Sequence, residues 1–362
     1  HKGTPAMSQA ALTTPAESAL PAAAVDAPNT FLRVFSKLLA VATLALIFFG
    51  GQVKSHEAGL SVPDWPLTYG QNPITYPLDQ WVGGIFYEHS HRLFAGGVAL
   101  GSCLLAALAW FLDKRAWVKK LAIAGVVAVL IQAVLGGMTV WYQLPVLVSS
   151  SHGLLAQTYL LINIILAYAF STERAERDTA VASGKPEVKT PILYGALALI
   201  ALLYVQLILG ALTRHTESGL AIPDFPTTAG QWIPSFNQDT VDKINALRDG
   251  KTDAVGTPLD DVQLYQIVIH FLHRVGAVVI VAFIALLTWL AVRYEKTHPH
   301  LLTLAYLLSG TVIAQFVLGM TIIMTQRSPA VASIHVTVGA ATLAFAGLLA
   351  LRAWPIKAGA AR

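Results

Sequence analysis

The stretch YEHSHR, residues 87–92, decides the fold, because it joins a long polar loop to an apolar run of about 20 residues, the length of a membrane span. Imidazole, carboxylate and guanidinium groups at the mouth of a membrane helix are costly to keep there, and such groups are functional candidates. The stretch returns 182 residues later as IHFLHR, residues 269–274, again at the start of an apolar run. The two copies differ in charge at one place, where Glu88 corresponds to His270.

The composition indicates a polytopic membrane protein. Of the 362 residues, 55% are hydrophobic and only 12% are charged, and the mean hydropathy is +0.60. A soluble domain carries about 25% charged residues. The net charge of +4 is therefore to be interpreted by location along the chain, and it does not indicate nucleic-acid binding. The single cysteine, Cys103, lies within an apolar run, where we expect a small buried side chain.

Eight segments are apolar over the roughly 20 residues that a span requires. They cover about residues 31–52, 89–112, 117–141, 150–171, 190–212, 265–292, 299–324 and 330–354. Lysine and arginine concentrate before the first span, after the second, fourth and sixth, and in the tail, so the positive-inside rule places both termini in the cytoplasm. The long loops, about 53–87 and 213–264, then lie outside. The polar composition of residues 237–261 favours a mobile segment.

The two ends of the chain are predicted from composition. Residues 1–30 are rich in alanine, proline, serine and threonine, which is typical of disorder, and the residues ahead of Met7 look like an added remnant. Residues 8–30 contain neither arginine nor lysine, which argues against a mitochondrial presequence. Residues 172–189 are expected to form a cytoplasmic linker, and residues 355–362 a tail.

An internal repeat relates the two halves of the chain. GLSVPDWP at residues 59–66 matches GLAIPDFP at residues 219–226, and QAVLG at 132–136 matches QFVLG at 315–319. The offset changes within the outer loop, where insertions are tolerated. We therefore predict an all-α integral membrane protein of two tandem four-helix bundles, residues 31–171 and 190–354. Because each repeat has an even number of spans, the repeats are related by a pseudo-two-fold axis along the membrane normal.

Four histidines occupy matched places near the outer ends of the even-numbered spans: His91, His152, His273 and His335. Two histidines at equal depth on facing helices of a bundle can hold one metal or cofactor between them. Histidine is a standard axial ligand of haem iron. Each half offers only two good ligands, which suits haem better than a metal cluster. Another metal, or a structural or proton-relay role, remains an alternative.

Four cationic side chains lie beside these histidines in the sequence. Arg92 and Arg274 follow two of them directly, and Lys54 and Arg214 end the first and fifth spans on the same face. Because guanidinium groups pair with carboxylates in bidentate fashion, these residues are candidates for holding haem propionates. The alternative is that their side chains reach the membrane interface without a ligand. That alternative stays open above all for Lys54 and Arg214.

Glu88 is the most informative difference between the copies. It precedes His91 by three residues, so both lie on one helix face. A carboxylate there can exchange protons with a bound substrate. We infer that the first half is the reactive one and the second is auxiliary. The alternative is that Glu88 caps the helix N-terminus. His89 faces elsewhere and is interpreted as a surface or interface residue.

Three glutamines, Gln132, Gln206 and Gln315, each stand four residues before a glycine. We expect them to join helices by hydrogen bonds, with cofactor contact as the lesser alternative. The PDWP and PDFP segments are predicted to be rigid turns that lay an aromatic ring over the bundle mouth. A plain interfacial aromatic belt would explain these rings equally well.

Taken together, the motifs resemble those of the haem A synthase family over residues 31–354. They are two four-helix repeats, E-x-x-H-R opening the second span, H opening the fourth, H-R opening the sixth, H opening the eighth, and the GLSVPDWP segment after the first span. The resemblance implies an integral membrane enzyme of cytochrome oxidase assembly. Such an enzyme oxidises the C8 methyl of haem O to the formyl group of haem A by successive hydroxylations and loss of water.

Carried over by motif position, the resemblance implies that His273 and His335 ligate a resident haem b. It implies that His91 and His152 bracket the substrate haem, with Glu88 as the catalytic carboxylate. It further implies the bacterial inner membrane, with haem O synthase and cytochrome oxidase subunits or assembly factors as candidate partners.

The sequence departs from some bacterial members of the family in one respect. Those members carry a cysteine pair in the first outer loop, whereas residues 61–68 contain no cysteine, which leaves the route of the electrons open. A di-haem cytochrome b-type electron carrier and a non-catalytic haem-binding assembly protein are the alternative functions. Glu88 against His270 distinguishes them, because a pure carrier has no need of a carboxylate beside only one haem.

Overall fold

The computed structural model describes residues 29–182, 191–294 and 299–355. Eight helices within these ranges are long and apolar enough to cross a membrane. They are α1 (Thr30–Ser55), α2 (Gly84–Leu112), α3 (Ala116–Trp141), α4 (Val146–Ala169), α6 (Ile192–His215), α8 (Leu264–Tyr294), α9 (Pro299–Met324) and α10 (Pro329–Ala353). The prediction of an all-α fold with eight spans is confirmed. The predicted disorder of the N-terminal segment falls almost wholly on residues outside the described ranges.

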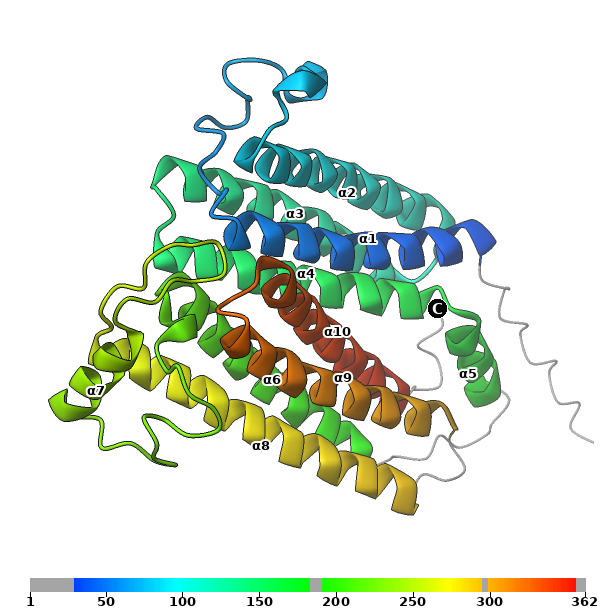
Figure 1. Cartoon of the computed structure of the whole chain (residues 1–362). Coiled ribbons are helices and arrows are strands. Elements are labelled where there is room, and N and C mark those ends of the chain that lie inside the picture. The colour runs from blue at the N-terminus through cyan, green and yellow to red at the C-terminus, as the bar shows by residue number, and fades with distance from the viewer. Residues whose placement is uncertain (1–28, 183–190, 295–298, 356–362) are drawn as a thin grey trace, which may run out of the picture.

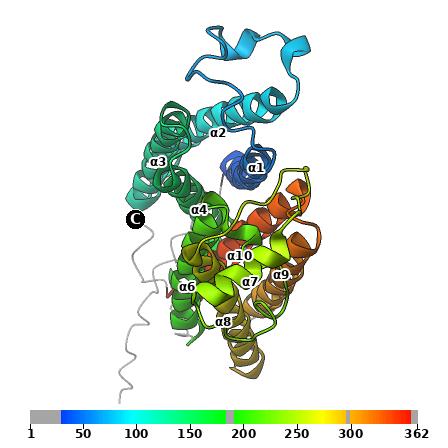
Figure 2. The same ribbon diagram turned by 60° about the vertical axis from the view of Figure 1, so that its left-hand side comes forward.

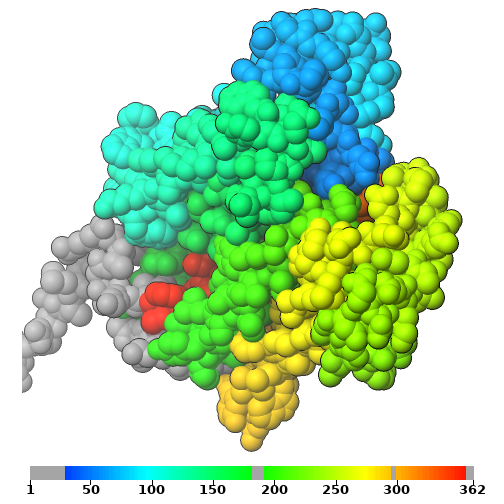
Figure 3. Space-filling model, turned by 90° about the vertical axis from the view of Figure 1, so that its left-hand side faces the viewer, coloured from blue at the N-terminus to red at the C-terminus, as the bar shows by residue number. Residues whose placement is uncertain are grey.

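The shorter helices lie at the two ends of the bundle. α5 (Thr172–Ala182) follows the fourth span, while the short helices η1 (Pro73–Thr75), η2 (Leu78–Gln80), η3 (Ser218–Leu220) and the helix α7 (Gln238–Arg248) belong to the outer loops. Figure 1 shows α5 at one end of the molecule and α7 with the long loops at the opposite end. In Figure 3, which looks onto the loop end, the two outer loops form separate lobes.

The outward faces of the spans are apolar, as contact with lipid requires. Leu100, Phe111 and Ile313 are all more than half exposed. Cys103 also lies on such a face, so the expectation that its side chain is buried was wrong. The reason is the helical period: α2 turns Ser102 and Leu105 inward, which leaves the intervening Cys103 on the outside.

Helix packing is repeated in the two halves. α1 packs on α2, α2 on α3, α3 on α4, and α4 returns to α1; α6, α8, α9 and α10 make the same four contacts. Figure 2 shows the two groups, with α4 and α10 meeting between them. This arrangement is consistent with the tandem repeat. The pseudo-two-fold axis and the domain boundaries stay predictions.

Each half has its own buried apolar cluster. One lies among α1–α4 and includes Leu39 and Leu105, and the other lies among α6 and α8–α10 and includes Leu199 and Ile284. A smaller cluster joins the halves, formed by Ile47, Leu160, Ala340 and Ala344. Small residues at this seam let the helix backbones approach closely, which is how membrane helices gain packing energy.

The second outer loop is more ordered than its composition suggests. Residues 237–261, which we expected to be mobile, contain α7, capped by Asn237, whose side chain accepts from Thr240 N. Val241 and Ile244 of α7 are buried against Ile222 and Ile267. The polar composition reflects the outer face of α7, while a few apolar residues at helical spacing hold its inner face.

The repeated PDWP and PDFP segments are closed by their aspartates. Asp64 accepts from the N–H groups of Tyr69 and Gly70, and Asp224 accepts from those of Ala229 and Gly230. Burial works to raise the pKa of Asp64, but these N–H groups and the charge of Arg92 outweigh it and hold the pKa below its ordinary value. The two loops therefore begin with the same polar turn.

Candidate functional site

Each of the four histidines packs its ring against a glycine of a neighbouring helix. The pairs are His91 with Gly50, His152 with Gly136, His273 with Gly210, and His335 with Gly319. A Cβ built on any of these glycines would lie only 3.1–3.6 Å from the nearest ring atom. The glycines thus form four matched cradles; a Cβ would crowd the ring at Gly50, Gly136 and Gly210 and would make ordinary contact at Gly319.

The ring nitrogens of these histidines face different surroundings. Nδ1 of His91, His152 and His335 is buried without a hydrogen-bond partner in the described structure. Nδ1 of His273 lies 3.1 Å from Gln206 Nε2. Among the described residues, no hydrogen bond engages Nε2 of any of the four rings. Nε2 is therefore the nitrogen that each ring can offer to a ligand.

The two histidines of the second half are spaced for one metal ion between them. Their ring centres lie 6.5 Å apart, with 68° between the ring planes. A metal–nitrogen bond of about 2.0 Å on each side places the centres of two opposed imidazoles about 6–6.5 Å apart. Among the described residues, no group of three or more His, Cys, Asp or Glu side chains could hold a metal ion. The donor set therefore fits the two axial ligands of a haem.

Glu88 fastens the first outer loop to α2. It is 4% exposed; its Oε2 accepts from Val62 N (2.7 Å), and its Oε1 accepts from Arg92 (2.5 Å). Arg92 also donates to the carbonyl oxygens of Val62 and Asp64. Glu88 lies in the second turn of α2 and bonds the loop, so it does not cap the helix N-terminus.

His270 makes the corresponding contacts in the second half. Its Nδ1 accepts from Ile222 N (3.2 Å), and Arg274 Nε lies 3.3 Å from its Nε2. Arg274 donates further to the carbonyl oxygens of Ile222 and Thr227. The two copies therefore share one architecture, and the difference between Glu88 and His270 is chemical: a carboxylate in one half and an imidazole in the other.

Lys54 and Arg214 connect the two halves at their outer ends. Lys54 Nζ lies 2.6 Å from Glu217, and Arg214 donates to Gly51 O and Ser55 Oγ of α1. Burial works to raise the pKa of Glu217, but Lys54 and Arg327 outweigh it and lower the pKa. All four predicted propionate ligands, Arg92 and Arg274 included, thus contact protein groups. Their role toward a ligand stays a prediction.

Arg327, which the sequence analysis did not single out, is the centre of this outer charge network. It pairs with Glu217, with Asp253 at 2.7 Å and with Glu57 at 3.4 Å. Its counterpart in the first repeat is Leu144. A charge present in only one copy was the signal that could have identified it.

His89 is buried within the protein, so its interpretation as a surface or interface residue was wrong. It is 0% exposed, its Nδ1 lies 3.1 Å from Thr68 Oγ1, and the rings of Tyr76 and Trp81 surround it. The outer loop folds over this face of α2 and covers it. His91 lies instead against Gly50 of α1.

The glutamines join helices, as predicted. Gln132 donates to His152 O (2.8 Å), Gln315 to His335 O (2.6 Å) and Gln206 to His273 O (2.9 Å).

The aromatic rings of the repeated turns reach across the loop end. Trp65 contacts Gly137 and Trp141 of α3, and Phe225 contacts Phe316 of α9. The turns thus connect the α1–α2 and α6–α8 pairs to the next helix of each bundle.

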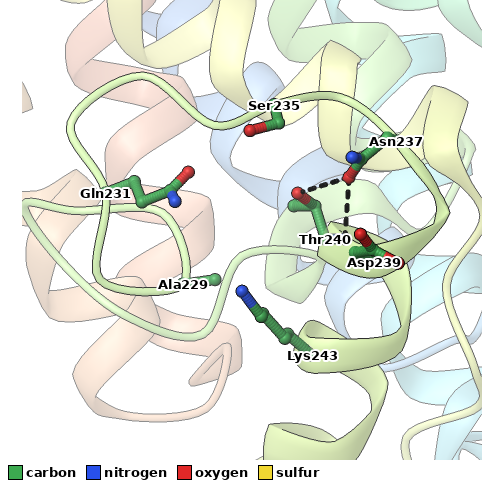
Figure 4. A pocket seen from close by; sticks show the side chains of 7 residues that line it. All are labelled: Ala229, Gln231, Ser235, Asn237, Asp239, Thr240 and Lys243. Carbon is green, nitrogen blue, oxygen red and sulfur yellow. Dashed lines mark hydrogen bonds between the residues drawn. The ribbon is translucent and has the colours of Figure 1, made fainter.

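A small polar pocket in the second outer loop lies apart from these residues. It is lined by Ala229, Gln231, Ser235, Asn237, Asp239, Thr240 and Lys243 (Figure 4). None of the four histidines lines it. Asn237 Oδ1 accepts from the backbone and the hydroxyl of Thr240, so the pocket marks the start of α7.

The chain is also similar in sequence to known proteins. The sequence model of the COX15-CtaA family, described as cytochrome oxidase assembly protein, matches residues 33–346. The heme A synthase of Alkalihalophilus pseudofirmus is 27% identical over 309 residues, which cover 84% of this chain and 91% of the relative. The heme A synthase of Listeria welshimeri is 27% identical over 329 residues, covering 89% and 96%. The chain therefore belongs to the COX15-CtaA family of cytochrome oxidase assembly proteins.

Proposed function

We propose that this protein is a haem A synthase, a membrane oxidoreductase that converts the C8 methyl of haem O into the formyl group of haem A. Family membership and the activity named for the relatives support this proposal. The observation that carries it is structural. Two matched histidine pairs are seated on glycines, and a carboxylate stands one turn before the histidine of only one pair.

The first half is the substrate site in this proposal. His91 and His152 bracket haem O. Two successive hydroxylations of its methyl carbon, each a two-electron oxidation that requires an external oxidant, give a geminal diol, which loses water to leave the aldehyde. Glu88 accepts a proton from one hydroxyl of the diol and returns it to the other hydroxyl, which leaves as water. Its hydrogen bonds to Val62 N and Arg92 hold the carboxylate in one orientation on the outer side of α2. Glu88 is the only acidic side chain within α2.

The second half holds a resident haem b through His273 and His335. The 6.5 Å separation of the rings and the cradles of Gly210 and Gly319 support this assignment. A haem bound there would supply one-electron transfer. His270 keeps the outer loop in place without adding a negative charge beside that haem.

The proposed location rests on the distribution of lysine and arginine along the sequence. We infer a bacterial cytoplasmic membrane, both termini in the cytoplasm, and both haem sites toward the outer face. Lys54 and Arg214 lie in the last turns of α1 and α6, and Arg92 and Arg274 lie in the third turns of α2 and α8, where haem propionates would reach them. Haem O synthase and the subunits or assembly factors of cytochrome oxidase are the partners we propose.

One observation favours a second function, that of a di-haem electron carrier. Glu88 and His270 make equivalent contacts with the outer loops, which is what a purely structural role for both would produce.

The substitution Glu88→His separates the two functions. It installs the side chain with which the second half holds its own loop, so the loop is retained while the carboxylate is lost. Haem O conversion, followed by mass analysis of extracted haem, should be abolished while haem b and thermal stability remain. Glu88→Gln, which keeps a hydrogen-bonding oxygen, should give the same loss. Conversion at the wild-type rate in both variants would rule out the carboxylate mechanism and leave the carrier.

A further inference from the structure

The helix pairs that carry His91 and His273 differ in one amide. In the second half, Gln206 stands one turn before Gly210 on α6. Its Nε2 donates to His273 O (2.9 Å) and lies 3.1 Å from His273 Nδ1. The matched place on α1, one turn before Gly50, is Leu46, which packs into the apolar cluster of the first half.

The residue that faces this amide also differs between the halves. A Cβ built on Gly276 of α8 would collide with Gln206 Oε1, so the amide occupies room that only glycine leaves. The first-half counterpart of Gly276 is Phe94, whose ring packs edge-on against Phe49 at 5.5 Å. The second half therefore pairs the amide of Gln206 with a glycine, whereas the first half pairs Leu46 with the ring of Phe94.

The other two helix pairs do not share this difference. Gln132 and Gln315 donate to the carbonyl oxygens of His152 and His335 at similar distances, 2.8 and 2.6 Å. The asymmetry in glutamine contacts is thus confined to the helix pairs of His91 and His273.

A partner at the far ring nitrogen fixes the orientation of a metal-bound imidazole and strengthens it as a ligand. When Nε2 of His273 binds a metal, its Nδ1 carries the hydrogen and needs an acceptor; Gln206 Oε1, which has no partner among the described residues, can take that role once the amide is turned over. Nδ1 of His91 is buried without such a partner. The ring of His273 is therefore fixed by a neighbouring amide, whereas the ring of His91 is not.

We propose that Gln206, seated against Gly276, is a positioning residue that holds His273 on the resident haem, and that Leu46 with Phe94 leaves His91 as the exchangeable ligand through which substrate haem enters and leaves. This inference rests on the proposed function.

The test in the second half uses the purified holoenzyme and the substitution Gln206→Met, which keeps the length of the side chain and removes the amide. Transfer of haem b to apomyoglobin should become about three- to ten-fold faster, as expected from the loss of one or two hydrogen bonds. The low-spin EPR signal of haem b should shift. Gly276→Ala, which displaces the amide without changing a ligand, should act in the same direction. The transfer rate of the first-half haem should stay unchanged in both variants.

The reciprocal test is the double substitution Leu46→Gln/Phe94→Gly, which gives the first half the arrangement of the second. Haem O and haem A should leave about three- to ten-fold more slowly, and kcat should fall without a rise in KM. Leu46→Met, similar in size and without an amide, is the control and should leave haem release at the wild-type rate.

Unchanged haem b transfer and EPR in both Gln206→Met and Gly276→Ala would overturn the inference, even if the double variant did not fold. The proposed function fails in a different way: only haem b would then be extracted from wild-type protein supplied with haem O, with no haem A formed.

Discussion

The two halves of the molecule share a scaffold and differ in the groups that surround their histidines. In both halves a glycine seats each ring, a glutamine of α3 or α9 holds one histidine helix, and an arginine ties the outer loop to the other. The differences beside the histidines are Glu88 against His270, Leu46 against Gln206 and Phe94 against Gly276. In the second half Gln206 contacts His273, while in the first half a carboxylate, Glu88, precedes His91 by one turn. Under the proposed function, these differences separate a site that retains its haem from a site that reacts and releases it.

The largest expected effect is on the midpoint potential of haem b when an axial ligand is replaced, which tests the assignment of the two halves. Replacing His335 by Met should raise the midpoint potential of haem b by roughly 0.1–0.3 V, within the range of about 0.8 V that axial ligands set. Redox titration of the purified protein measures this. The matched variant His152→Met should leave the potential of haem b unchanged. A shift caused by His152→Met and not by His335→Met would reverse the assignment of the halves.

The glycine cradles sharpen the comparison. A Cβ at Gly50 would lie 3.1 Å from His91 Cε1, so Gly50→Ala should displace the ring and slow haem O conversion about three- to ten-fold, for a loss of about 1 kcal/mol. Gly210→Ala, with 3.2 Å to His273 Cε1, should instead shift the EPR signal of haem b. Gly97, with open space beside it, provides the control. Gly97→Ala should change neither readout and should raise helix stability by up to about 1 kcal/mol. Equal effects at all three glycines would contradict the cradle.

A smaller effect concerns the charge network that only the second repeat carries. Arg327→Leu restores the residue type of the first repeat and leaves the nearly buried Asp253 unpaired, so the free energy of unfolding should fall by about 1–3 kcal/mol. Thermal unfolding in detergent measures this. Lys54→Met, which removes a single pair with Glu217, should cost less. A larger loss from Lys54→Met would show that Arg327 is not the centre of the network.

The smallest effect is on pH dependence. Asp64, Asp224 and Glu217 have pKa values lowered in the folded protein. Their contribution to stability is therefore fully present above their ordinary values of 3.8 and 4.5 and is lost as the pH falls through the lowered values. Tm should thus decline as the pH drops below about 4, and Asp64→Asn should flatten that decline. An unchanged Tm–pH profile in Asp64→Asn would show that this turn contributes nothing.

Much of the fold could be predicted from the sequence because hydropathy and the repeat are local signals. The eight spans and the inward direction of His91 follow from helix period and spacing. The remainder depends on contacts between distant segments. Glu88 meets Val62 across 26 residues, His89 is buried only because the outer loop folds over it, and Arg327 meets Glu57 across 270 residues. The composition of α7 concealed the few apolar residues that hold it.

The most direct test of the account is the identity and amount of haem extracted from two double variants. His91→Ala/His152→Ala should retain one haem b per chain and lose haem O and haem A. His273→Ala/His335→Ala should lose haem b. Loss of haem b from the first variant with retention in the second, or equal loss from both, would contradict the division of the molecule into a reacting and a retaining half.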